Sequence, residues 1–131
     1  MSTPGLAIAT QLAAAPGLSL VLGTSVFNGP VREQPVRGVW CLTTGGRPPD
    51  DIVGNLTQGY RYHRVQIRIR EEQQNFGAGE TLARGVRDAV HIIVPASYID
   101  CRAVESSPLY LGPDDFGRHE WAINVELTIR E

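Results

Sequence analysis

Residues Arg64-Val65-Gln66-Ile67-Arg68-Ile69-Arg70 decide the fold of this chain, because every second side chain in the stretch is apolar. A strand points successive side chains to opposite faces of a sheet, so the alternation predicts a strand with one buried and one polar face. Residues 121–130 alternate in the same way, and one helix is expected between the two strands. The sequence therefore predicts a sheet with a charged outer face and no pocket, a surface typical of contacts with other proteins.

The charged face of the first strand carries Arg64, Arg68 and Arg70, and that of the second carries Glu126 and Arg130. One interpretation is a solvated strand face, to which cross-strand pairing with Glu126 contributes modestly. A second interpretation is a subunit or partner interface, because the planar guanidinium forms bidentate bonds to carboxylates and stacks on aromatic rings. Nucleic-acid binding is the remaining interpretation.

The composition is that of a single globular domain spanning residues 1–131. Apolar residues make up 42% of the 131-residue chain and charged residues 20%, a balance that argues against general disorder. The net charge of −2 lacks the strongly basic character of proteins that grip duplex nucleic acid. No stretch approaches the ~20 apolar residues of a membrane span, and the first residues do not form a leader. We therefore expect a soluble protein made in a reducing cytoplasm.

Two cysteines and three histidines have the most potential for chemistry. Cys41 and Cys101 lie in strand-like runs, so we expect small buried hydrophobic side chains rather than a disulfide or a metal site. His63, His91 and His119 match no metal-ligand spacing and are expected to have surface or structural roles. No serine or cysteine has the context of an activated nucleophile. The sequence thus predicts a non-enzyme that holds no metal and no cofactor.

Two helices are predicted. A short alanine-rich helix is expected over residues 5–15 and ends at Pro16-Gly17. A long helix is expected over about 77–94 and ends at Pro95, which cannot continue it. Apolar residues at helical spacing form one stripe along the long helix: Leu82, Val86, Ala89, Val90 and Ile93.

Further strands are expected over residues 36–44 and 98–104, which are rich in β-forming residues. Residues 18–22 are expected to begin a short extended run, and 26–35 to form a turn-rich connection. This order of elements predicts an α+β two-layer sandwich. Its sheet is expected to be mostly antiparallel with about four or five strands, packed with one long and one short helix.

Two loops carry the strongest turn signals. The first, Gly45-Gly46-Arg47-Pro48-Pro49-Asp50-Asp51, opens a stretch of little periodicity to about residue 62, and connections of that length are often functional. It lacks the lysine and the following helix of a phosphate-binding loop. In the second, Asp114-Asp115 stands between two glycine-containing pairs, which predicts a turn with aspartates as local caps. An intersubunit ion pair is the alternative, whereas a calcium site would need further oxygen ligands.

Four segments occur in a characteristic order. They are the first helix running into Phe27-Asn28-Gly29-Pro30, the Gly45–Asp50 loop before the 64–70 strand, a single helix over Glu80–Val94, and Pro108–Arg118 before a long terminal strand. In this order the chain resembles the tail terminator and tail-completion proteins of long-tailed phages, over most of its length. The Gly77-Ala78-Gly79 run before the helix departs from the pattern.

The resemblance implies a ring of identical subunits, expected to be a hexamer, that caps the finished tail tube. Such a ring halts the addition of tube subunits and offers its other side to the head-tail connector or stopper protein. DNA then passes through the lumen without specific binding, which the near-neutral charge of the chain suits. The resemblance places the protein in the tail or neck of the virion after synthesis in the host cytoplasm.

A closed ring needs two different surfaces on each subunit. The candidates for these surfaces are the face of Arg64, Arg68 and Arg70 and the turn of Asp114, Asp115 and Arg118. The candidates for contact with the tube or the lumen are Arg47, Asp50, Asp51 and Arg61. Charge reversal at Arg68 is accordingly expected to weaken ring formation.

Two other classes of protein remain open. A head-completion or stopper protein of the neck has a similar small fold and ring symmetry. A small ligand-binding or enzymatic α+β domain is the alternative outside the virion, and a deep pocket with convergent polar groups would favour it.

Overall fold

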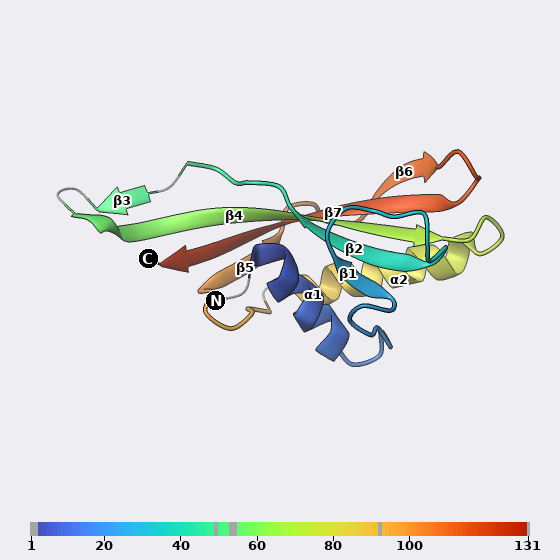
Figure 1. Cartoon of the computed structure of the whole chain (residues 1–131), viewed down its shortest axis with the longest axis horizontal. Coiled ribbons are helices and arrows are strands. Elements are labelled where there is room, and N and C mark those ends of the chain that lie inside the picture. Colours follow the sequence, from blue (N-terminus) through green and yellow to red (C-terminus); the bar gives the residue numbers. More distant parts are fainter. Residues whose placement is uncertain (1–2, 49, 53–54, 92, 131) are drawn as a thin grey trace.

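The computed structural model of the chain describes residues 3–48, 50–52, 55–91 and 93–130. Two helices and seven strands lie in these ranges (Figure 1). In chain order they are α1 (Pro4–Ala14), β1 (Val26–Asn28), β2 (Gly38–Thr43), β3 (Asp50–Ile52), β4 (Asn55–Glu71), α2 (Phe76–Val90), β5 (Asp100–Ala103), β6 (Leu109–Pro113) and β7 (His119–Arg130). Neither helix is long and apolar enough to cross a membrane.

One sheet holds all the described strands, and β4 and β7 form its centre. The order is β1-β2-β4-β7-β5, with β3 also beside β4 and β6 also beside β7. The pairing of β4 with β7 runs from Tyr60 opposite Arg130 to Glu71 opposite His119. All of these pairs are antiparallel except β1 with β2. The two alternating stretches of the sequence are therefore neighbours in the centre of the sheet, as expected.

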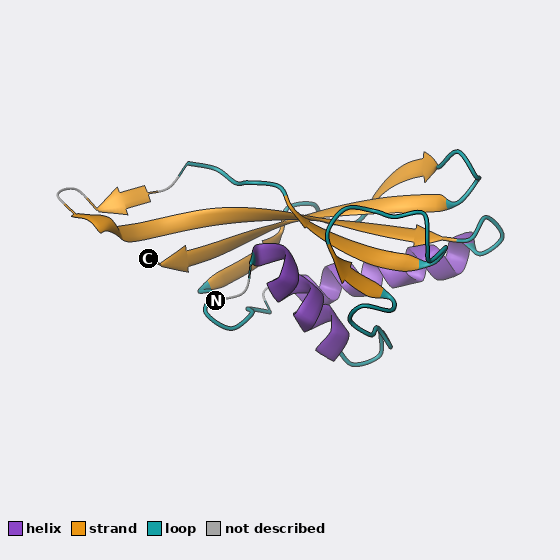
Figure 2. Ribbon diagram, in the orientation of Figure 1, coloured by secondary structure: helices purple, strands orange, loops and turns teal. Residues whose placement is uncertain are grey.

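Both helices pack against one face of the sheet (Figure 2). The alternation predicted from the sequence is confirmed, because Val65, Ile67 and Ile69 of β4 are fully buried while Arg64, Gln66 and Arg68 between them are partly exposed. The apolar core consists of these side chains, their counterparts on β2 and β7, and one side of each helix, including Ile8, Leu12, Leu82, Val86 and Val90. The molecule is an α+β fold.

The sheet has seven strands where four or five were expected. Three strands lie in segments predicted as loops or turns: β1, β3 and β6. Each has three to five residues, which is too short for a period-2 pattern to stand out. The long strand β4 also begins at Asn55, nine residues before the predicted start. Its first residues form a strand by pairing with β3.

Helix α2 ends at Val90 instead of Val94. His91 after it has extended backbone angles, and its ring Nδ1 accepts a hydrogen bond from the Ala103 N–H at 3.1 Å. This contact with β5 draws the chain out of the helix before Pro95 is reached. Ile93 is consequently 53% exposed and not part of the buried stripe. The extended run expected over residues 18–22 is also wrong, since only Leu22 forms an isolated bridge.

Two glycines of α2 differ in what surrounds them, and this yields a stability prediction. A Cβ added to Gly79 would lie 2.6 Å from the Trp121 ring and 2.6 Å from the Glu71 Cβ, whereas one added to Gly77 meets nothing. We expect Gly79→Ala to lower the free energy of unfolding by about 1–3 kcal/mol through overpacking. Gly77→Ala, the control, is expected to raise it by about 0.5–1 kcal/mol through helix propensity. Urea unfolding of both variants tests this, and equal effects would contradict the close packing of Gly79.

Candidate functional site

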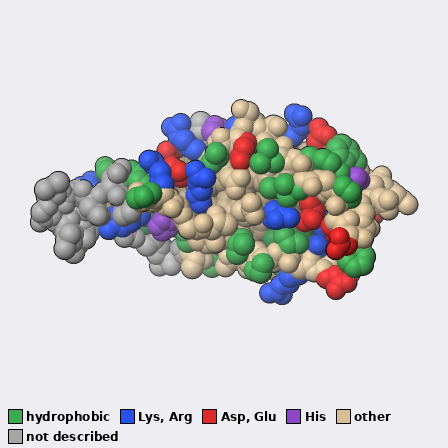
Figure 3. Space-filling view, turned by 90° about the horizontal axis from the view of Figure 1, so that it is seen from above, with side chains coloured by type: hydrophobic (Ala, Val, Ile, Leu, Met, Phe, Trp, Pro, Cys, Tyr) green, Lys and Arg blue, Asp and Glu red, His purple; other side chains and the backbone are tan. Residues whose placement is uncertain are grey.

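The charged residues predicted on β4 lie on the sheet face opposite the helices. Arg64 stands directly across from Glu126 of β7, and their side chains approach to 3.7 Å. Arg47 binds the same carboxylate at 3.2 Å, and its guanidinium stacks 3.6 Å above the Tyr62 ring. The predicted pairing of the arginine face with Glu126 is thus confirmed. Figure 3 shows basic and acidic side chains interspersed over this face rather than a field of one sign.

Arg68 pairs with Glu120 of β7 at 3.4 Å. The Arg68 side chain is 32% exposed and that of Glu120 is 15% exposed, so both remain within reach of solvent. A partly exposed pair of this kind contributes little to stability.

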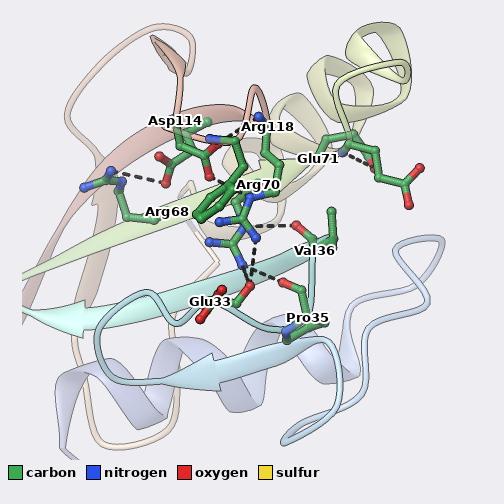
Figure 4. A network of polar contacts seen from close by, with 11 residues as sticks. Glu33, Pro35, Val36, Arg68, Arg70, Glu71, Asp114 and Arg118 are labelled. Carbon is green, nitrogen blue, oxygen red and sulfur yellow. Dashed lines mark hydrogen bonds and ion pairs between the residues drawn. The ribbon is translucent and has the colours of Figure 1, made fainter.

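Arg70 does not belong to the exposed face that the sequence predicted, because it is only 3% exposed. Its guanidinium donates hydrogen bonds to three backbone carbonyls of one loop: Glu33 at 2.9 Å, Pro35 at 2.6 Å and Val36 at 3.0 Å (Figure 4). It also stacks on Trp40, 4.7 Å from the ring. Arg70 therefore fastens the 33–36 loop over the sheet, and an alternating pattern could not distinguish this role from surface exposure.

Asp114 and Arg118 shape the turn between β6 and β7. The Asp114 carboxylate accepts hydrogen bonds from the N–H groups of Phe116 and Arg118 at 2.9 and 2.8 Å, and from Arg118 Nε at 2.7 Å. The predicted turn with Asp114 as a local cap is confirmed. Arg118 Nη1 also donates to the Glu33 carbonyl at 2.8 Å, so this turn and Arg70 hold the same loop (Figure 4).

The arginine face and the acidic turn were expected to be two separate surfaces. The structure instead brings Asp114 and Arg118 close to Arg70, within range of electrostatic interaction (Figure 4). Burial lowers the pKa of Arg70, Arg118 lowers it further, and the carboxylates of Glu120 and Asp114 oppose this. Those residues therefore form one intrachain network.

The Asp114 network predicts a pH dependence. Burial acts to raise the pKa of Asp114, but the hydrogen bonds from Arg118 and Phe116 hold it below its ordinary value of 3.8. A carboxylate with a depressed pKa stabilises the fold above its ordinary pKa, and this stabilisation is lost as the pH falls through the lower folded value. We expect the free energy of unfolding to fall below about pH 3.8, and less so in Asp114→Asn.

The control for that experiment is Asp115→Asn. Asp115 is exposed and forms no ion pair within the described part of the chain. Unfolding measured from about pH 6 downward should give the control the same acid dependence as the unaltered protein. An identical slope in Asp114→Asn would contradict the assignment.

The segment predicted as a long loop holds a strand pair. Asp50 and Asp51 are in β3, opposite Tyr60 and Gly59 of β4, and their side chains lie outside the described residues. Arg47 comes before β3 in the chain, and Arg61 directly follows the part of β4 that pairs with β3. Both arginines line an open hollow together with Gly46 and Tyr62. The four residues proposed to face the tube or lumen therefore belong to one end of the molecule.

The cysteines and histidines have structural positions. Cys41 and Cys101 are free and buried, as expected, and burial raises the pKa of each thiol to about 12. His119 contacts the Tyr110 hydroxyl at 2.7 Å and the Gln73 carbonyl at 3.0 Å. Among the described residues, no three His, Cys, Asp or Glu side chains gather as a metal site would require.

Two features were missed by the sequence reasoning. One is the strand arm, which we define as β3 with residues 55–59 of β4 and which projects from one end of the molecule (Figure 1). The other is β6, an edge strand whose Leu109, Tyr110 and Leu111 are 45%, 46% and 48% exposed. The apolar run Leu109-Tyr110-Leu111 was the available signal for β6, and the adjoining proline and glycine turns obscured it.

The geometry defines a small α+β protein whose charges are mostly paired within the chain and whose exposed features are a projecting arm and an apolar edge, an arrangement typical of an assembly component. The family described as "Bacteriophage tail terminator protein" matches residues 17–131. The chain belongs to this family, and the resemblance stated from the sequence is confirmed.

A solved structure has a similar fold. It is a chain of the "Virion of native gene transfer agent (GTA) particle", with a TM-score of 0.66 and 18% sequence identity, and the match covers 98% of this chain and 95% of that chain. No curated protein matches the chain.

Proposed function

We propose that the protein caps the finished tail tube as a ring of identical subunits, expected to be a hexamer. The ring stops the addition of tube subunits and provides the joint to the head connector. The genome passes through its lumen without specific binding. Residues 1–131 act as one domain with a structural rather than a catalytic role, in the tail and neck of a virion assembled in the host cytoplasm.

The family match over residues 17–131 carries this proposal. The likeness to a chain of a gene transfer agent virion supports the fold, since that match extends over 98% of this chain. The charge distribution is also suitable, because basic and acidic side chains are interspersed over the face seen in Figure 3 and the net charge is −2. A lumen of this kind would not retain a polyanion by counterion release.

The test is the length of tails, measured by electron microscopy, in particles made without this gene. Abnormally long tails of variable length, detached from heads, are expected. Tails of normal length beside DNA-filled, tailless heads would instead indicate a stopper on the head side of the neck. Normal infectious particles would overturn the proposal and favour a ligand-binding or enzymatic domain.

The proposed interface role of Arg68 needs a control, because Arg68 also pairs with Glu120 within the chain. We expect Arg68→Glu to weaken ring formation, measured by analytical ultracentrifugation or by the yield of capped tails. The double variant Arg68→Glu with Glu120→Arg restores the intrachain pair with its charges exchanged. If the double variant recovers ring formation, Arg68 acts only within its own subunit; if it does not, Arg68 faces a partner.

A further inference from the structure

Among the described residues, one side of the strand arm has no hydrogen-bonded strand. Tyr60 of β4 pairs with Asp50 of β3 and also with Arg130 of β7, so β3 and β7 must lie on opposite sides of β4. Twelve of the 17 residues of β4, Tyr60 to Glu71, pair with β7, and the five from Asn55 to Gly59 extend beyond the last described β7 partner. Over this extension of about 17 Å, the β7 side of β4 has no strand partner within the described residues.

Strand β6 has an open edge at the other end of the molecule. In the part of the chain that the structure describes, β7 is its only strand partner. Its exposed residues Leu109, Tyr110 and Leu111 are all apolar, and Tyr110 joins Phe76 and Trp121 in an aromatic cluster with ring centroids 5.4 and 5.5 Å away. An exposed apolar edge is a ready site for the addition of a strand from another chain.

We propose that the arm of one subunit adds as a strand to the β6 edge of the next subunit in the ring. Within the described ranges each edge has backbone groups without a strand partner, and the two edges are equal in length, since β6 also has five residues. The contact joins two different surfaces, which is the heterologous geometry that closes a ring. This inference rests on the proposed function and names the contact that would build the ring.

Charge complementarity favours a second copy of this chain as the occupant. Arg130 stands where the open side of β4 begins, and Asp115 lies in the turn that follows β6. Both side chains are exposed, and neither forms an ion pair with another described residue. When β6 runs parallel to the arm, its Pro113 end lies beside Gly59 and the turn brings Asp115 to Arg130 of the neighbour.

Two features of β6 limit strand addition at its edge to a single strand. A bulge interrupts its register with β7 between Tyr110 and Gly112, and Pro113 at its end has no N–H to donate. Such features prevent an edge from recruiting strands indefinitely. The edge therefore suits a short partner held by a defined ring rather than open-ended aggregation.

Cysteine cross-linking in assembled particles tests the contact. Thr57→Cys and Leu111→Cys place a thiol near the middle of each strand, and the native cysteines are both buried. After mild oxidation, the double variant is expected to give a ladder of covalent multimers on a non-reducing gel. The matched control, Thr57→Cys with Thr81→Cys on the exposed surface of α2, should stay monomeric.

Each other outcome overturns the proposed contact. A dimer from Thr57→Cys alone would show that two arms pair with each other, and a cross-link to a tube subunit, identified by mass spectrometry, would assign the arm to the tube. Monomers in particles with normal tails would refute the contact while leaving the proposed function intact. The length of tails in particles made without this gene tests the proposed function separately.

A charge exchange provides an independent test if the cysteine variants fail to assemble. Asp115→Arg and Arg130→Asp should each weaken subunit association about two- to fivefold per contact, as expected for one exposed ion pair. The double variant should recover association, measured by sedimentation. Additive losses in the double variant would overturn the pairing.

Discussion

Arg70→Met is expected to lower the free energy of unfolding by about 3–5 kcal/mol, which is a large fraction of the stability of a domain of this size. The substitution leaves an unbranched side chain in place but removes the donors that bind the carbonyls of Glu33, Pro35 and Val36. Hydrogen bonds from a charged group are among the stronger ones, and three acceptors lose their partner together. Equilibrium urea unfolding, with the midpoint and slope fitted separately, measures the loss.

The control is Arg68→Met on the same face of the same strand. Arg68 contacts Glu120 at 3.4 Å and is partly exposed, so its loss should cost within about 1 kcal/mol. Both variants remove one arginine charge, so the difference between their free energies of unfolding reports the burial and the carbonyl hydrogen bonds of Arg70. Equal costs would contradict the role of Arg70 in holding the 33–36 loop.

Gly46→Ala is expected to lower the free energy of unfolding by about 3 kcal/mol or more. A Cβ at this position would lie 1.8 Å from the Tyr62 carbonyl oxygen and 2.8 Å from its carbon. Both atoms belong to the backbone of β4, which is held by neighbouring strands, so a rotamer change cannot relieve the clash. The segment must move away from β4, and Arg47 is expected to lose its contacts with Tyr62 and Glu126.

Gly45→Ala separates this clash from backbone strain. Gly45 has a φ of +90°, but a Cβ there meets nothing within 4 Å. Its replacement should therefore cost only about 1–2 kcal/mol, the penalty for an L-residue in the left-handed region. Hydrogen exchange at the Arg64 amide, which donates to the Gly45 carbonyl at 2.6 Å, would report local release of the segment. If the two variants are equally stable, Gly46 does not pack against β4 as the structure shows.

The central part of the fold could be predicted because it obeys a simple pattern. In residues 64–70 and 121–130 every second side chain is apolar, since one side of each strand faces the core, and the structure places both strands side by side. The first helix was also predicted correctly to within about one residue, because Pro16-Gly17 ends its alanine-rich run. In these segments local sequence and tertiary packing agree.

The short strands could not be predicted because they form through pairing with other strands, and their own residues carry no strand pattern. Val26–Asn28 becomes a strand through parallel pairing with β2, and Asp50–Ile52 through pairing with an extension of β4. The position of Arg70 illustrates the same limit for side chains. Its alternation matches that of Arg64 and Arg68, yet a loop about 35 residues earlier in the chain covers it.

The interface roles of the charged candidates stay predictions, and the structure shows which of these residues already have partners within the chain. Arg118 and Asp114 were expected to meet another subunit, and they bind each other and the Glu33 carbonyl. The ion pair between Asp114 and Arg118 is local, whereas the contact of Arg118 with the Glu33 carbonyl joins segments that are distant in the sequence. The interface candidates that the structure leaves with exposed charge are Arg64, Arg68 and Asp115, and their contacts with partners stay predictions.

The central place of β7 also constrains the order of events during synthesis. Its partners on β4 lie 48 to 70 residues earlier in the chain, from Glu71 opposite His119 to Tyr60 opposite Arg130. Until the ribosome has released β7, the strands β4, β5 and β6 lack the neighbour that joins them, and pairing over such separations is slow. A nascent chain therefore cannot present a finished β6 edge, and subunits would become competent to associate only after translation of their last strand.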